Sequence, residues 1–155
     1  MEKKIKDVIC DLATRITLFQ SMTMEEIEYI CPYFEFMAYP AETYVFQEGD
    51  PGDWMGFIVS GKLEVQKSTT YPGKHIIMAY MGQGSVIGEM SLIEERDRSA
   101  SVYAMENTEL LILRTDQMEA IIRSHPSIGA KLLKGIAWIL CKRLRQLGDR
   151  LRVII

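Results

Sequence analysis

The most informative stretch of the sequence reads IGEMSL at residues 87–92 and, after five intervening residues, RSASV at residues 98–102. The apolar residues before Gly88 are typical of a strand end, and the residues after it fit one short helical turn. The first turn of a helix exposes backbone N–H groups without partners in the helix, and these groups favour an anion. The small side chain of Ser91 would let an anion approach that backbone closely. The stretch therefore predicts an anion-binding turn at the end of a strand.

Two charged residues of this stretch indicate the class of ligand. Arg98 lies nine residues after Glu89, and its planar guanidinium is suited to a phosphate. The Glu89 carboxylate cannot bind the same phosphate, so it would accept hydrogen bonds from a hydroxyl such as a ribose 2′-OH. A 3′,5′-cyclic nucleotide carries both groups in one ring system. The alternative is a surface Glu–Arg pair beside a polar loop, and such a pair contributes little stability.

The residues around this stretch alternate between short β-type runs and turn signals from Phe34 to about Leu113. Short strands at regular spacing are typical of an antiparallel sandwich or barrel. The turn signals lie at 49–53, 60–61, 72–73 and 82–84. The expected strands span 43–46, 55–59, 62–67, 76–81, 99–104 and 109–113.

Helical patterns precede the β-rich segment. Apolar residues recur at helical spacing between Asp11 and Phe19. Thr23 and Glu26 have the spacing of a capping box, which predicts the start of a second helix that Pro32 ends.

Two further helices are expected after the β-rich segment. Thr115 or Asp116 can cap a helix that runs to about Ser124, and Pro126 suits the first turn of the last helix. That helix carries an apolar residue at alternating steps of four and three, which is the seam of a coiled coil. We expect residues 133–137 to pack on the domain itself and the rest of the seam to pair with a second copy; a core helix is the alternative. The dimer seam comprises Leu133, Ala137, Leu140, Leu144, Leu147 and Leu151, and the repeat extends to Ile154.

Charge is distributed unevenly along the 155 residues. Residues 131–155 hold seven basic side chains and one acidic side chain, whereas the remainder holds 11 basic and 20 acidic ones. This asymmetry suggests a separate role for the C-terminal segment, or simply a solvated helix face that balances an acidic body. The N-terminus has no apolar run behind its lysines, and no run approaches the ~20 apolar residues of a membrane span, so a cytoplasmic protein without membrane association is expected.

Several classes of site are disfavoured by the residues present. The chain has two isolated histidines, His75 and His125, which are expected in an exposed strand start and a turn. The three cysteines, Cys10, Cys31 and Cys141, lie far apart and are expected to be reduced and buried. No metal site, catalytic residue or cofactor is therefore predicted, and an enzyme is the least favoured of the functional hypotheses.

With these motifs the chain resembles the cyclic-nucleotide-binding domain family, and within it the sensor half of the catabolite activator/Fnr-type bacterial regulators. The resemblance rests on Gly-Glu-Met-Ser-Leu at 88–92, Arg-Ser-Ala at 98–100, Gln-Glu-Gly-Asp at 47–50 and Ile-Val-Ser-Gly at 58–61. It implies one mainly β domain over 1–155, an antiparallel, jelly-roll-like β-roll (a double-stranded β-helix) with flanking helices. The segments would be N-terminal helices at 12–32, the roll at 34–114 with the phosphate-binding cassette at 87–102, and C-terminal helices at 115–155.

The resemblance also implies roles for individual residues. Glu89 would accept from the ribose 2′-OH and Arg98 would pair with the cyclic phosphate. Val65 and Met78 are the aligned candidates beside the base, although both are equally explained as core residues, and Leu147 is a third candidate. The remaining cassette residues expected at the ligand are Gly88, Met90, Ser91, Ser99 and Ala100.

Two departures from the family pattern bear on function. Where the activator branch presents a Thr-Ser pair to the adenine of cAMP, this chain has Leu147 and Gly148. We expect cAMP to be favoured over cGMP. The loss of the Thr-Ser pair should weaken both the discrimination between the two nucleotides and the affinity. The helix-turn-helix domain that follows in family regulators is not present before the last residue, Ile155, so we expect no sequence-specific DNA binding by this chain alone.

The residues leave two functional classes open. In the first, the chain is a regulatory sensor that binds a cyclic nucleotide and signals through a homodimeric C-terminal helix to an unknown downstream protein. In the second, it is a scaffold with a vestigial site, and its basic C-terminal helix binds an acidic partner or nucleic acid.

Overall fold

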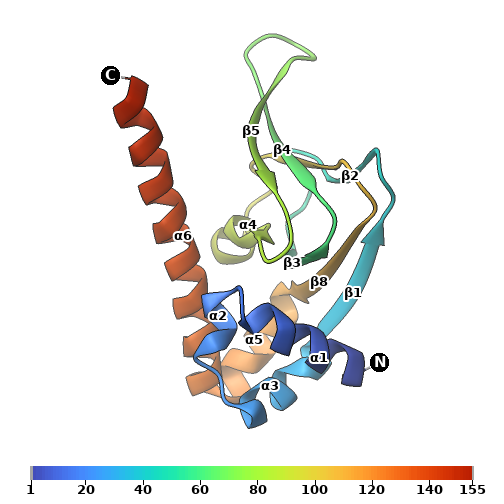
Figure 1. Cartoon of the computed structure of the whole chain (residues 1–155), viewed down its shortest axis with the longest axis vertical. Helices are drawn as coiled ribbons and strands as arrows, with labels where there is room; N and C mark the ends of the chain where they lie inside the picture. The colour runs from blue at the N-terminus through green and yellow to red at the C-terminus, as the bar shows by residue number, and fades with distance from the viewer. Residues whose placement is uncertain (1, 155) are drawn as a thin grey trace.

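Two four-stranded antiparallel sheets face each other in the computed structural model, which describes residues 2–154. One sheet has the order β1-β8-β3-β6 and the other has the order β2-β7-β4-β5. Helices cover the outer face of the first sheet, while the β4–β5 hairpin extends away from them (Figure 1). The strands are β1 (Phe34–Tyr39), β2 (Thr43–Phe46), β3 (Trp54–Ser60), β4 (Leu63–Ser68), β5 (His75–Met81), β6 (Val86–Ile87), β7 (Ser101–Ala104) and β8 (Thr108–Arg114).

The expected jelly-roll-like roll with flanking helices is confirmed by this arrangement. Six strands fall where the sequence predicts them, although the strand expected at 99–104 begins at Ser101. β1 and the two-residue β6 were not predicted as separate strands, because β1 has no strict alternation and β6 is too short for a periodic signal.

The central strand β8 is buried on both faces, which explains its continuous apolar run. Leu110 and Ile112 lie in the core between the two sheets, while Leu111 and Leu113 lie in the core between the first sheet and the helices. Successive side chains of a strand point to opposite faces, so one strand contributes to both cores.

The helices and the first sheet enclose the core that contains Leu111 and Leu113. They are α1 (Glu2–Ala13), α2 (Thr17–Gln20), α3 (Met24–Ile30), the 3₁₀ turn η1 (Cys31–Tyr33), α4 (Glu89–Glu94), α5 (Thr115–Ser124) and α6 (Pro126–Ile154). The helix predicted between Asp11 and Phe19 is wrong in its bounds. This segment holds the end of α1, a turn after Ala13 and most of α2. Residues before the expected start at 12 belong to α1, whose Ile5 and Ile9 are buried. The capping box of Thr23 and Glu26 is confirmed.

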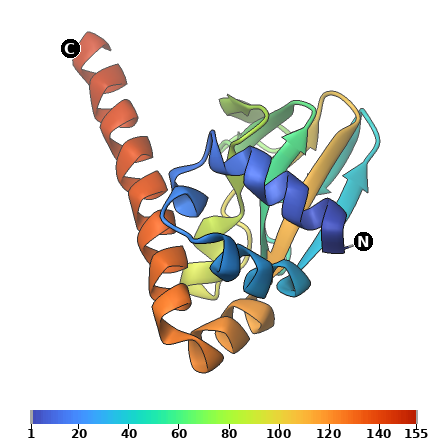
Figure 2. The same ribbon diagram turned by 60° about the horizontal axis from the view of Figure 1, so that its bottom comes forward.

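Helix α6 lies against the domain over its first half and then leaves it (Figure 2). Its buried residues are Ile128, Gly129, Leu132, Gly135 and Ile136, and an added Cβ at Gly135 would lie 2.7 Å from Leu18 of α2. The expectation that residues 133–137 pack on the domain holds for Gly135 and Ile136, which are buried. The seam residues Leu133, at 38%, and Ala137 are exposed, since the packed face lies to one side of the seam.

Two smaller expectations, on the cap of α5 and on the cysteines, also have clear outcomes. Neither Thr115 nor Asp116 caps α5, because Arg114 occupies the cap position and makes no side-chain capping bond. Cys141 is exposed on α6 rather than buried, whereas Cys31 is buried and Cys10 is half-buried. No helix within residues 2–154 has the length and apolarity needed to span a membrane.

Candidate functional site

The turn between β6 and α4 forms one wall of a cavity. Gly88 occupies the position before α4 with φ 73°, a left-handed conformation that glycine adopts readily. A Cβ at Gly88 would lie 2.5 Å from Nη1 of Arg98 and 2.9 Å from the carbonyl oxygen of Trp54. Glycine is therefore required both by the backbone conformation and by the close approach of the arginine.

Arg98 is buried behind this turn, with 3% of its surface exposed. Its guanidinium carbon lies 4.1 Å from the ring centre of Phe46 and 4.6 Å from that of Trp54. Nη1 approaches the Gly88 carbonyl oxygen at 3.4 Å, but Nε and Nη2 have no hydrogen-bond partner among the described residues. Burial lowers the pKa of the Arg98 guanidinium, yet an arginine stays charged at neutral pH. The site thus holds the Arg98 guanidinium, whose Nε and Nη2 donate no hydrogen bond within the described residues.

Glu89 is the first residue of α4 and is 3% exposed. Burial raises the pKa of its carboxyl group, and the nearby Arg143 guanidinium acts in the opposite direction. Nη1 of Arg143 donates to Oε1 of Glu89, and Nη2 donates to the Val86 carbonyl oxygen. The long helix α6 is therefore joined directly to the cassette through Arg143.

Arg143 was not predicted from the sequence as a site residue. Its only signal was its place in the basic C-terminal segment, which offers seven basic residues and no rule for choosing among them. The choice depends on the rotation of α6 about its axis, and that rotation is set by the packing of Leu132 and Ile136.

The cavity between the cassette, β4, β5 and α6 has a volume of about 330 Å³. Its polar groups gather at α4, at residues 98–100, at Lys67 and at Arg143, whereas the remaining wall is apolar. Seven of the lining residues were not predicted as site residues: Phe46, Lys67, Met81, Val86, Ile87, Val102 and Arg143. The lining comprises Phe46, Val65, Lys67, Met78, Met81, Val86, Ile87, Gly88, Glu89, Met90, Ser91, Arg98, Ser99, Ala100, Val102 and Arg143.

All seven cassette residues expected at the ligand lie on this cavity, and so do the base candidates Val65 and Met78. Leu147 does not line the cavity: it lies one turn beyond Arg143 on the part of α6 that has left the domain, and it is 51% exposed. Leu144 and Leu151 are also exposed, at 68% and 52%, whereas Leu140 packs partly against the helical core.

The arrangement is suited to binding rather than to covalent chemistry. Arg98 offers two donors to an anion, Glu89 offers a carboxylate to a hydroxyl, and the apolar wall can cover a planar ring. Within residues 2–154 no group of three or more His, Cys, Asp or Glu side chains is placed to hold a metal ion.

Comparison with known proteins connects this cavity to a family. Residues 36–125 match the family model described as "Cyclic nucleotide-binding domain". The chain is 36% identical over 129 residues to a cyclic AMP receptor protein from Thermus thermophilus, an alignment that covers 83% of this chain and 57% of that protein. Across three curated relatives, the chain spans 29% to 62% of their length.

Solved structures give the same result. A cyclic nucleotide-binding domain from Methylobacillus flagellatus superposes with a TM-score of 0.88 at 32% identity, covering 98% of this chain and 85% of that one. The Thermus thermophilus catabolite activator protein superposes with a TM-score of 0.75 at 34% identity, covering 88% of this chain and 62% of that one.

Proposed function

The chain belongs to the cyclic nucleotide-binding domain family, and on that premise we propose that it is a regulatory sensor for a cyclic purine nucleotide, with cAMP favoured over cGMP. The cyclic phosphate would pair with Arg98, and the ribose 2′-OH would donate to Glu89. The base would lie against the apolar wall that includes Val65 and Met78. The name of the Thermus relative, a cyclic AMP receptor protein, supports cAMP as the first ligand to test.

The state of Arg98 is the observation that carries the proposal. A buried guanidinium with unused Nε and Nη2 donors is costly, because buried polar groups are almost always hydrogen-bonded. A singly charged phosphate ester offers two acceptor oxygens to such a pair of donors. The cost of the unpaired donors is then recovered on binding.

The contact between Glu89 and Arg143 suggests how binding would reach α6. A ribose hydroxyl that donates to Glu89 would compete with Arg143 for the same carboxylate, and any change at Arg143 is transmitted to the helix that carries it. We propose that this biases the orientation or pairing of α6, whose exposed leucines would form the seam of a homodimer. Such a bias is limited by the difference in ligand affinity between the two states.

Isothermal titration calorimetry tests the proposal directly. cAMP should bind saturably with one site per chain, 5′-AMP should bind much more weakly, and Arg98→Ala should abolish or greatly weaken binding of cAMP. If neither cAMP nor cGMP gives a binding heat with the wild-type chain, the proposed function is wrong.

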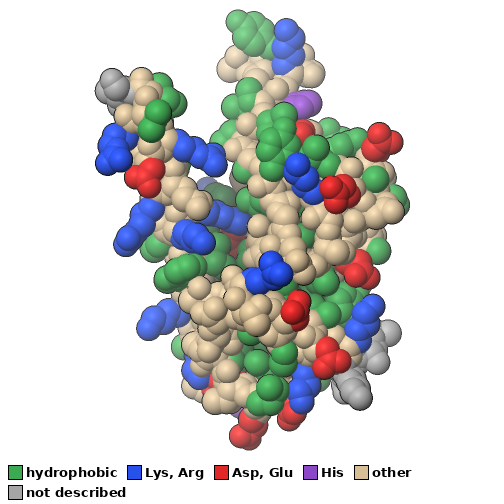
Figure 3. Space-filling view, in the orientation of Figure 1, with side chains coloured by type: hydrophobic (Ala, Val, Ile, Leu, Met, Phe, Trp, Pro, Cys, Tyr) green, Lys and Arg blue, Asp and Glu red, His purple; other side chains and the backbone are tan. Residues whose placement is uncertain are grey.

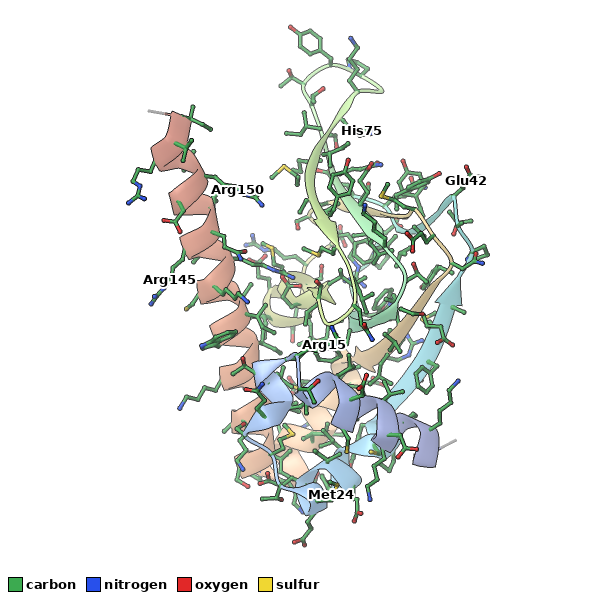
Figure 4. All side chains as sticks on the ribbon, in the orientation of Figure 1. Arg15, Met24, Glu42, His75, Arg145 and Arg150 are labelled. Carbon is green, nitrogen blue, oxygen red and sulfur yellow. The ribbon has the colours of Figure 1, made fainter. Side chains whose placement is uncertain are left out.

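The basic face of α6 supports a second candidate function, in which the chain binds a polyanionic partner. Lys134, Lys142, Arg145 and Arg152 form no ion pair among the described residues. Cationic side chains line the protruding helix (Figure 3), and Arg145 points away from the roll whereas Arg150 points toward the β4–β5 hairpin (Figure 4). Association with duplex DNA that weakens steeply with salt and ignores cyclic nucleotide would favour this function.

A further inference from the structure

Lys67 connects the cassette to the loop that follows β2. Its Nζ donates to the Ser99 carbonyl oxygen and to Oε1 of Glu48, both at 2.5 Å. Glu48 also accepts from the backbone N–H of Ser68 at 3.0 Å and from the Ser68 hydroxyl. Lys67 itself lines the cavity. The lysine is thus held between a carboxylate and one specific carbonyl of the proposed phosphate-binding arm.

The geometry of a peptide unit gives this contact a consequence for ligand binding. The carbonyl of Ser99 and the N–H of Ala100 belong to one planar trans unit, in which the two groups point in opposite directions. A donor that fixes the Ser99 oxygen therefore fixes the direction of the Ala100 N–H as well. We propose that Lys67 is a positioning residue, which holds the 99–100 peptide so that the Ala100 N–H is presented to the anionic part of the ligand in the cavity.

The identity of the ligand in this inference rests on the proposed function, whereas the contacts of Lys67 do not depend on it. The arm is also tied to the loop through its backbone: Gly49 N–H donates to the Arg98 oxygen at 2.9 Å, and Arg98 N–H donates to the Asp50 oxygen at 2.8 Å. These two bonds fix the backbone only as far as Arg98. The orientation of the Ser99–Ala100 peptide therefore depends on Lys67. Glu48 N–H donates to the Ser101 hydroxyl at 2.9 Å beyond it.

Glu48 limits the electrostatic effect that Lys67 can have on the ligand. Hydrogen bonds from Lys67 and Ser68 lower the pKa of the Glu48 carboxyl to about 2, so it is ionised near neutral pH. Its charge opposes that of Lys67, so the ion pair as a whole carries little net charge. Lys67 should therefore act through orientation and through polarisation of the peptide, since a charged donor on the carbonyl strengthens the N–H on the other side.

The first arm of the test uses the chain without nucleotide. In ¹⁵N relaxation measurements the Ala100 amide should have an order parameter of about 0.85, as a rigid backbone does, and in Lys67→Met it should fall toward about 0.6. Lys67→Arg should restore most of this order. Lys62→Met is the matched control, because Lys62 precedes the same strand and contacts Tyr80 rather than the cassette. An unchanged Ala100 amide in Lys67→Met overturns the positioning role.

The second arm measures affinity by calorimetry. Lys67→Met should weaken cAMP binding about 10-fold, as expected for one misdirected hydrogen bond to a charged group, and Lys67→Arg should regain most of the loss. Adenosine binding should not change, and the thermal unfolding midpoint should fall only slightly, because the lost Lys67–Glu48 ion pair is partly exposed. Equal cAMP affinity in wild type and Lys67→Met overturns the inference. Absence of binding in the wild type would instead refute the proposed function, and the relaxation arm would still decide whether Lys67 orders the peptide.

Discussion

Replacing Arg98 with methionine should stabilise the protein while it abolishes nucleotide binding. Arg98 is 3% exposed, and its Nε and Nη2 have no hydrogen-bond partner among the described residues. Methionine has a similar length, carries no charge and makes favourable contacts with aromatic rings. A residue that is needed only for a ligand should be costly when that ligand is absent, and this variant measures the cost.

The magnitude follows from the contacts of Arg98. Two unused buried donors on a charged group cost on the order of 2–4 kcal/mol. The stacking on Phe46 and Trp54 returns about 1–3 kcal/mol, and the 3.4 Å approach to Gly88 adds little because it is long for a hydrogen bond. Methionine would regain about 0.5 kcal/mol through contacts with the same rings. The expected net effect is a stabilisation of about 1 kcal/mol, or roughly 2–4 °C in the unfolding midpoint of a chain of this size.

Urea unfolding followed by circular dichroism, with calorimetry of thermal unfolding, measures this difference. Arg96→Met is the control, because Arg96 lies in the same loop but is exposed, and its replacement should change stability by less than about 0.5 kcal/mol. A loss of 2 kcal/mol or more in Arg98→Met would refute the reasoning, since it would mean that the guanidinium is satisfied by the protein itself.

Three further predictions follow from the cavity and from α6. In Arg143→Met the pKa of the Glu89 carboxyl should rise further, because burial remains while the neighbouring cation is lost. Folding then favours the protonated acid, so stability should fall as pH rises through that pKa. A ¹³C NMR titration of the carboxyl should find this upward shift, and an unchanged pKa would contradict the prediction. Affinities for cAMP and cGMP should differ by about tenfold or less, because the wall that we propose to cover the base, which includes Val65 and Met78, is apolar. Competition calorimetry that finds a 1,000-fold difference would contradict this. If α6 forms the dimer seam, Leu144→Glu combined with Leu151→Glu should yield a monomer in analytical ultracentrifugation, whereas an unchanged mass would exclude the seam.

The sequence predicts the roll well because its strands are short, apolar and separated by turn residues. The hairpin at Ser60 and Gly61 illustrates this: the residues on either side are β3 and β4, close to the expected bounds. The bounds of the first helix were missed because α1 and α2 together resemble one interrupted helical pattern. The family resemblance is confirmed, since it rests on motifs whose spacing identifies a site without any knowledge of packing.

The site is only partly predictable, because the sequence does not specify how distant elements meet. The cassette residues are close together in sequence, and the structure brings all of them to one cavity. Arg143 lies 54 residues from Glu89, on a helix whose rotation depends on buried contacts elsewhere. Leu147 lies on the part of α6 that has already left the domain, so it does not line the cavity. The roles of the cassette residues toward a ligand stay predictions.

A crystal structure of the chain with cAMP would show where the nucleotide lies relative to Arg98 and Glu89. We expect the cyclic phosphate in the cavity beside α4, with its oxygens within about 3.2 Å of Nε and Nη2 of Arg98 and the ribose 2′-OH at a similar distance from Glu89. Nucleotide bound elsewhere, or bound in the cavity while both arginine donors stay unpaired, would contradict this expectation.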